Sequence, residues 1–248
     1  MVSIAGLSLA AALIAVDPAS AQVVAPTPPS AAPKAAAPST PIVNVYTTLD
    51  LESGCKRARS DTKAADAKTA DAKAADAKAD PGVGGRWQCG GPKGFEVLFA
   101  EDDLRQFLGY GAKARAQRSA QQTLAPFNSI FRDGRDRATI QWRGTMQAGK
   151  FVPFATIVRY HVDTGDDGAR DDGKNKRQRS QVLVVTKLGA ADGSEACHLA
   201  YIDAVANKDA LVMAAQAADE RAPTFNCKDQ PVVLGTKGTV PAVVPMRT

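Results

Sequence analysis

The sequence predicts an α+β fold, namely an antiparallel β-sheet accompanied by two or three helices. Three observations lead to this class: four β-rich segments follow one another between residues 137 and 204, a hairpin pattern precedes them, and alanine-rich segments with helical character flank them. Short loops join the first two and the last two segments, which favours a meander. Residues 22–41 and 231–248 are rich in Ala, Pro, Gly or Val, so we expect disordered segments at both ends.

The first 21 residues have the features of a secretory signal peptide. An apolar run of 13 residues, Ile4–Val16, precedes Ala19-Ser20-Ala21, which is a small-x-small cleavage pattern. The run is shorter than the roughly 20 residues that cross a bilayer, and no later segment is longer or more apolar. We therefore expect cleavage between Ala21 and Gln22, a mature chain with no transmembrane segment, and a periplasmic location, with secretion as an alternative. An uncleaved anchor is the other interpretation, because Lys and Arg are absent before the run.

One globular domain is predicted over residues 42–230, after a linker at 22–41. The linker contains six prolines and a single charged residue, which is typical of an extended tether. The domain opens with a β-rich run from Ile42 to Leu51. Within the domain, residues 60–82 carry an A-K-x-A-D repeat without an apolar stripe, so this insertion is a solvated helix or a disordered loop.

The four cysteines favour two disulfides in an exported chain. Three pairings are possible, and we favour Cys55 with Cys89 and Cys197 with Cys227, because each pair flanks a continuous stretch with its own secondary-structure signals. A zinc site is disfavoured because no two cysteines have C-x-x-C spacing. His198 follows Cys197 directly, but neighbouring strand residues point to opposite faces, which disfavours a Cys/His nucleophile pair.

A hairpin and two helices are predicted between residues 84 and 124. Gly90-Gly91-Pro92 marks the hairpin turn, and Phe95–Phe99 forms its second strand. Asp102 or Asp103 can then cap a helix that begins at Leu104, and glycines at 109 and 111 can end it. A second, partly exposed helix is expected over Ala112–Leu124.

The predicted meander is followed by a final helix. The four strands are expected over residues 137–143, 152–162, 181–188 and 195–204. Asn207 or Asp209 can start the helix, which should run to about Arg221. The residues of this helix that we expect to face inward are Leu211, Val212 and Ala215.

Signals of catalysis are weak. The chain has no phosphate-binding loop, dinucleotide-binding, nucleophile-elbow or zinc-protease motif, so no cofactor is expected. It also carries no specific nucleic-acid-binding motif. The loop from Asp163 to Arg179 resembles a calcium loop only in part, because Lys174 occupies the position of the bidentate Glu; no metal site is expected. The two histidines, His161 and His198, both lie on predicted strands. With a carboxylate, either could serve a small hydrolase, which is the alternative function.

The favoured function is a non-enzymatic binding or envelope-associated module. The formal net charge is +5, and a basic surface attracts anionic polymers. The partner is unknown from the sequence; an envelope protein or an anionic cell-surface polymer fits this charge. The aromatic and amide side chains of residues 121–131 have two interpretations: they line a groove, or they form a helix that ends before Pro126 and a packed turn after it.

Seven short segments, spread over most of the predicted domain, carry a resemblance to a known group. These segments are Tyr46–Asp50, Trp87–Cys89, Glu101–Arg105, Gln122–Leu124, Ala155–Arg159, Leu183–Lys187 and Cys197–Ala204. Through them the chain resembles a family of uncharacterised exported proteins of alphaproteobacteria. The resemblance implies export and a shared domain, and it implies no activity. The A-K-x-A-D repeat is an addition to the shared pattern, which favours its interpretation as a tolerated insertion.

Overall fold

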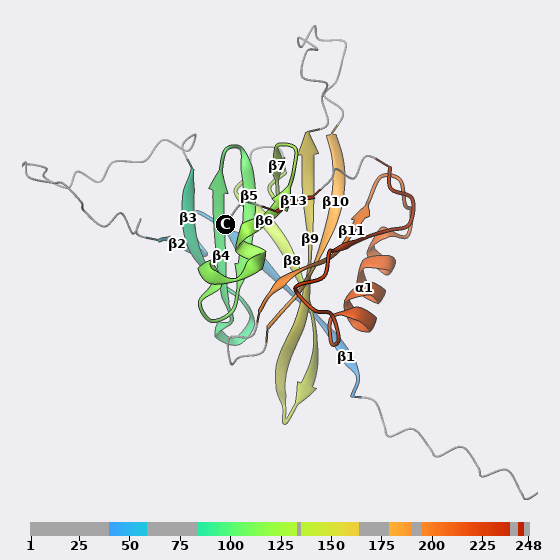
Figure 1. Ribbon diagram of the computed structural model, residues 1–248. Helices are drawn as coiled ribbons and strands as arrows, with labels where there is room; N and C mark the ends of the chain where they lie inside the picture. The colour runs from blue at the N-terminus through green and yellow to red at the C-terminus, as the bar shows by residue number, and fades with distance from the viewer. Residues whose placement is uncertain are drawn as a thin grey trace, which may run out of the picture. The chain divides into compact units, whose positions relative to one another are not determined.

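A computed structural model describes most of the predicted globular domain (Figure 1). The described residues are 40–58, 84–132, 135–163, 179–189, 195–238 and 243–245. The predicted signal peptide, nearly all of the linker, the A-K-x-A-D insertion and residues 164–178 of the charged loop lie outside them.

The larger sheet, sheet A, contains the predicted meander. Its strands are β1 (Ile42–Asp50), β8 (Arg137–Gln147), β9 (Lys150–Asp163), β10 (Arg179–Lys187), β11 (Cys197–Asp203) and β12 (Val232–Leu234), in that spatial order, with β7 (Asn128–Ser129) beside the end of β9. Each of β8 to β11 pairs antiparallel with the next, so the meander is confirmed. The β-rich run at the start of the domain becomes β1, which pairs antiparallel with β8. The pairing of β11 with β12 is parallel, and sheet A is therefore mixed.

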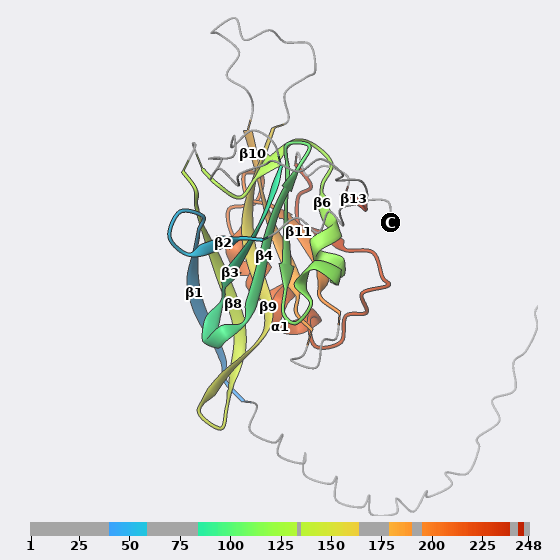
Figure 2. The same cartoon turned by 90° about the vertical axis from the view of Figure 1, so that its left-hand side faces the viewer.

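The second sheet, sheet B, contains the predicted hairpin. Its strands are β2 (Cys55–Arg57), β3 (Gly85–Gly90), β4 (Glu96–Asp102) and β5 (Arg105–Tyr110), all antiparallel. The 3₁₀ turn η1 (Pro92–Gly94) lies between β3 and β4, where the glycines and proline predicted a turn. Figure 2 shows β3 and β4 in front of β8 and β9, so the two sheets face each other. The apolar side chains between them belong to one core cluster, with Trp142, Phe99 and Leu108 at its centre.

The helix predicted to begin at Leu104 is wrong. Asp103 and Leu104 form the two-residue turn between β4 and β5, and both have positive φ, 48° and 57°. Two positive φ values suit a tight hairpin because they match the right-handed twist of the strands. Asp102 and Asp103 have the pattern of a helix cap, but residues 106–110 are buried on both faces of β5. Packing on both faces favours an extended strand over a helix at this position.

The helix predicted over Ala112–Leu124 is also wrong. The segment forms two 3₁₀ turns, η2 (Ala114–Ala116) and η3 (Arg118–Gln121), followed by β6 (Gln122–Leu124). It packs closely on β5: a Cβ added to Gly109 would lie 2.4 Å from the Ala114 carbonyl oxygen. The segment has no continuous apolar stripe, so a regular helix would have little to bury. It is held instead by the contacts of its 3₁₀ turns with sheet B.

The one α-helix among the described residues, α1 (Ala210–Arg221), confirms the final predicted helix. It covers the face of sheet A opposite sheet B, where it packs over β9, β10 and β11. Leu211 and Val212 were expected to face inward, but they are 52% and 66% exposed. Ala215, the third residue expected to face inward, is partly buried against the core beneath the helix. The buried positions of α1 are Ala210, Ala214, Ala217 and Ala218. Small side chains let the helix approach a sheet whose own Leu183, Val185 and Ile202 already supply the bulk.

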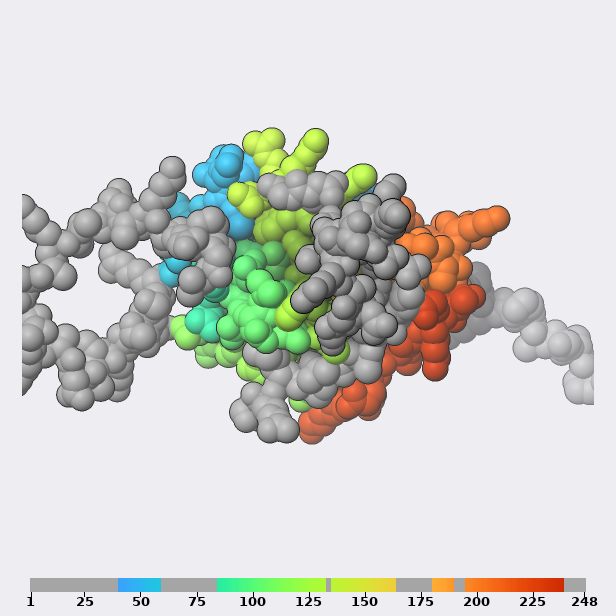
Figure 3. Space-filling model, turned by 90° about the horizontal axis from the view of Figure 1, so that it is seen from above, coloured from blue at the N-terminus to red at the C-terminus, as the bar shows by residue number. Residues whose placement is uncertain are grey.

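Two further findings concern the ends of the domain. The predicted C-terminal tail contributes β12 to sheet A and β13 (Val243–Pro245), which pairs with β6. In the view from above, the green residues of sheet B and the orange to red residues of the C-terminal part of the chain occupy different parts of the visible surface (Figure 3). No helix within the described residues is long and apolar enough to span a membrane.

Candidate functional site

Both favoured disulfides are present. Cys55–Cys89 joins β2 to β3 at a directly paired position, and Cys197–Cys227 joins the start of β11 to the segment after α1. Cys89, Cys197 and Cys227 are buried, so these bonds stabilise the fold and offer little access to a redox partner. The described chain contains no free cysteine.

His198 lies in the core, because a β-bulge changes the face to which it points. Val185 pairs with Ala200 and Thr186 pairs with His198, which leaves Leu199 as an extra residue of β11. The bulge places His198 on the same face as Tyr201, and His198 Nδ1 lies 2.8 Å from the Tyr201 hydroxyl oxygen. Burial lowers the pKa of His198 to about 3, so its ring is neutral at ordinary pH.

Several buried hydroxyl groups lie on the same side of sheet A. Burial raises the pKa of Tyr160 well above its ordinary value, and the nearby Tyr110 and Tyr201 hydroxyls raise it further. Burial also raises the pKa of Tyr110. The hydroxyls of Tyr110, Tyr160 and Thr156, with that of Ser119, have no hydrogen-bond partner among the described residues.

The two histidines do not converge. His161 alternates along β9 with Tyr160 and Val162 of the inter-sheet core, so it lies on the opposite face of sheet A from His198. It is partly buried near the end of β9, across from Gln181 of β10. For His198, no carboxylate partner occurs among the described residues. A general base must reach its substrate, so the position of His198 does not favour the hydrolase alternative.

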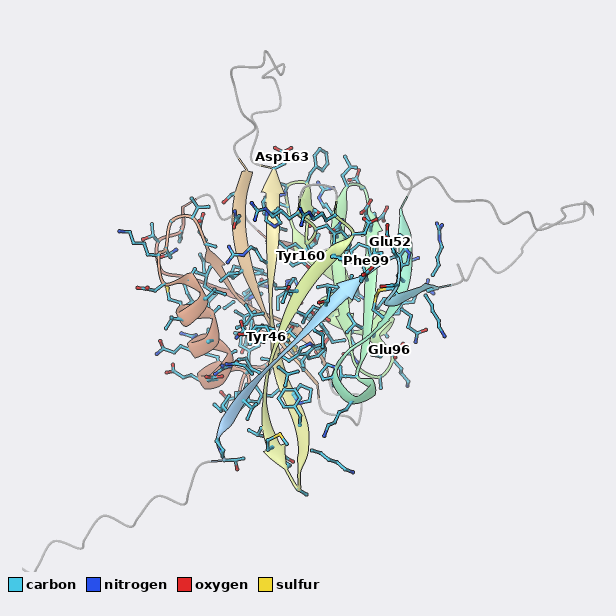
Figure 4. The ribbon with its side chains drawn as sticks, turned by 180° about the vertical axis from the view of Figure 1, so that it is seen from behind. Tyr46, Glu52, Glu96, Phe99, Tyr160 and Asp163 are labelled. Atoms are coloured by element: carbon cyan, nitrogen blue, oxygen red, sulfur yellow. A yellow bond between two sulfur atoms is a disulfide. The ribbon has the colours of Figure 1, made fainter. Side chains whose placement is uncertain are left out.

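The face of sheet A that carries α1 is only partly covered by it. The helix packs over β9, β10 and β11, whereas β1, most of β8 and the end of β9 remain outside its contact. Figure 4 shows β1 in front of β8 beside the helix, with Tyr46 near the middle of this region. We call this region the open face; its residues are Ile42, Tyr46, Thr48, Thr139, Gln141 and Arg159.

The open face combines an exposed aromatic ring with polar side chains. Tyr46 is 62% exposed and lies directly across from Gln141. Gln141 pairs with Ile157 of β9, and Arg159 follows two residues later on the same face. Thr48 and Thr139, also directly paired, are exposed beside them.

Arg159 differs from two other arginines on this side of sheet A. Arg143 donates to both carboxylate oxygens of Asp219 on α1. The Arg137 Nε atom lies 2.7 Å from the Asp50 Oδ2 atom. Arg159 instead donates to the side-chain amide oxygen of Gln181, at 2.7 Å, and has no carboxylate partner among the described residues. Partial burial lowers the pKa of Arg159, yet an arginine remains charged in proteins. A partly desolvated guanidinium without a carboxylate is suited to bind an anion.

A second exposed apolar group lies at the turn between β4 and β5. Leu104 is 57% exposed, and Phe127 of the neighbouring loop is 46% exposed. The Asn128 N–H donates to the Leu104 carbonyl oxygen at 3.1 Å, which holds the loop against the turn. The Arg105 guanidinium lies 5.3 Å from the centre of the Phe127 ring. Within residues 121–131, the stretch discussed as a groove, Phe127 is therefore exposed, whereas its neighbour Asn128 is hydrogen-bonded to the turn.

The sequence showed the alternation that puts Arg159 and His161 on one face, but it missed Arg159 and Tyr46 as candidate binding residues. Their significance depends on which part of the sheet α1 covers, and no local pattern carries that information. No group of metal-ligating side chains was found in the described ranges. Comparisons with protein-family models, curated proteins and solved structures found no match to this chain.

Proposed function

We propose that this chain is an exported, non-enzymatic binding module that contacts an anionic polymer of the cell envelope through its open face. The observation that carries this proposal is Arg159, a partly buried guanidinium that lies on an exposed sheet surface without a carboxylate partner among the described residues. Export is supported by the predicted signal peptide and by two disulfides, which persist in oxidising compartments.

The chemistry of the open face fits an acidic polysaccharide. A guanidinium presents paired N–H donors to a carboxylate or sulfate group. Tyr46 offers an exposed ring for the apolar face of a sugar, and the Gln141 and Thr48 side chains can exchange hydrogen bonds with hydroxyl groups. The net charge of +5 increases the local concentration of such a polymer.

Binding to polygalacturonate, with uncharged dextran as the control polymer, tests this proposal by isothermal titration calorimetry at several salt concentrations. We expect binding to polygalacturonate alone, weakened by salt. Arg159→Gln should weaken binding about tenfold, which corresponds to ~1.4 kcal/mol.

The matched control is Arg137→Gln, which removes the same charge from the same side of the sheet but from an arginine that is already paired with Asp50. It should change affinity less than about twofold, because an exposed, paired charge contributes little. Equal losses in the two variants would show a response to net charge alone and would refute the open-face site. Equal binding of both polymers would refute the anionic partner.

A further inference from the structure

Strand β1 forms one edge of sheet A, and it is long for an edge strand. Over all nine of its residues it pairs with β8 in an unbroken register, and no described strand pairs with its other side. A free strand edge presents unpaired N–H and C=O groups, to which another strand can bond.

One hydrogen bond beyond the strand identifies which residues point outward. The Leu51 N–H donates to the Asp136 carbonyl oxygen at 3.0 Å, and this pair continues the register of β1 with β8. Because successive residues direct their backbone groups to alternate sides, the odd-numbered residues of β1 bond to β8. The N–H and C=O groups of Asn44, Tyr46 and Thr48 therefore point away from β8, and they have no backbone partner among the described residues.

The other sheet edges are short or covered. Strands β12 and β2 have three residues each, and β2 carries Lys56 and Arg57. Strand β5 is covered by η3 and β6. By contrast, residues 42–49 of β1 contain no charged residue, proline, glycine or bulge, which are the usual means of protecting an edge.

We propose that the β1 edges of two copies of this chain pair antiparallel about a two-fold axis, which joins their larger sheets into one continuous sheet. The outward residues fit this symmetry: Tyr46 lies opposite Tyr46 of the second copy, and Asn44 lies opposite Thr48 in both directions. Each of these pairs can exchange two backbone hydrogen bonds. The two Tyr46 rings meet as a cross-strand aromatic pair.

A second copy fits this edge better than a charged partner strand. Residues 42–49 are neutral, so self-pairing brings no like charges into direct opposition along them, and the edge offers no charge with which to select another protein. The +5 charges of two copies repel at longer range, and salt screens this repulsion. Salt should therefore favour the dimer, whereas it should weaken the proposed binding of an anionic polymer. The inference does not depend on the proposed function, and the opposite salt effects separate the two.

Sedimentation velocity of the purified protein, over about a hundredfold range of concentration, tests this inference. We expect a monomer–dimer equilibrium that shifts toward the dimer as salt increases. Thr48→Pro removes an outward N–H without removing a hydrogen bond to β8, and it should abolish the dimer. Thr48→Ala keeps that N–H and should dimerise as the unchanged protein does.

Amide hydrogen exchange gives a second measurement that needs no variant. On concentration, the Tyr46 and Thr48 amides should gain protection at least about tenfold, while the Thr47 amide, which faces β8, should stay constant. A monomer at every concentration would overturn the inference. So would a dimer that the proline variant retains, or protection that rises equally at Thr47.

Discussion

The two faces of sheet A carry ionisable side chains in opposite states. On the face toward sheet B, His198 and the neighbouring tyrosines are buried and neutral; burial lowers the pKa of His198 and raises the pKa of Tyr201. On the other face, Arg143 and Arg159 are charged. Arg143 is bound to Asp219 of α1, and Arg159 lies on the part of the sheet that α1 does not cover. In this protein, solvent access and bonding partners, rather than residue type, therefore separate structural from functional candidates.

The largest expected effect concerns the Arg143–Asp219 pair, which connects β8 to α1. Its two side chains are 10% and 22% exposed. Arg143→Met leaves the Asp219 carboxylate without its partner, so we expect the free energy of unfolding to fall by about 3 kcal/mol, measured by urea denaturation. The control Arg137→Met breaks an ion pair whose arginine side chain is 65% exposed. The Asp50 carboxylate keeps the hydrogen bonds that it accepts from the Glu52 and Ser53 N–H groups, so this change should cost less than about 1 kcal/mol. Similar losses would mean that α1 does not depend on Arg143.

The second prediction concerns pH and the core face. The folded-state pKa of His198 is about 3, below the ordinary value of 6.5, so the unfolded chain binds the proton first as pH falls. This contribution is fully present above pH 6.5 and decreases between pH 6.5 and 3, by up to about 1.4 kcal/mol for each pH unit.

His198→Gln should remove this slope. The measurement is the difference in unfolding free energy between the two proteins at pH 7 and at pH 5, which subtracts the common contribution of the carboxylates. A difference that is independent of pH would show that the His198 ring can be protonated in the folded state.

The smallest expected effect compares two tyrosines of the core face. Tyr160→Phe removes a hydroxyl that has no partner among the described residues, so stability should remain the same or rise by up to about 1 kcal/mol. Tyr201→Phe instead removes the hydrogen bond to His198, and we expect a loss of about 1 kcal/mol. Thermal unfolding of both variants measures the contrast, and a larger loss for Tyr160→Phe would contradict it.

Parts of the fold that rest on local patterns were predictable. The alternation of apolar and polar residues identified β8 and β9, and the continuous apolar run at residues 182–185 is typical of an interior strand such as β10. The hairpin before them and the helix ending at Arg221 also followed from turn residues and composition. The cysteine pairs could be favoured because each one closes a separate stretch of chain.

Other parts depended on contacts between distant segments. The acidic residues before Leu104 have the pattern of a helix cap, but packing on both faces of the next segment made it a strand. Alternation could not locate His198, because one bulged residue in β11 reversed its face. The inward side of α1 was misjudged because the sheet beneath it required alanines rather than bulk.

The strands of the meander and the favoured cysteine pairs could be inferred from the amino-acid sequence, since apolar patterning and the signals within each cysteine-bounded stretch are local properties of the chain. Which polar residues are accessible depends on the packing of distant segments. Arg159 and Tyr46 are candidates because α1 stops short of them, and His198 is not because it is fully buried. Burial is a property of surfaces brought together from distant parts of the chain, so a local pattern can place a side chain on a face but cannot tell what covers that face.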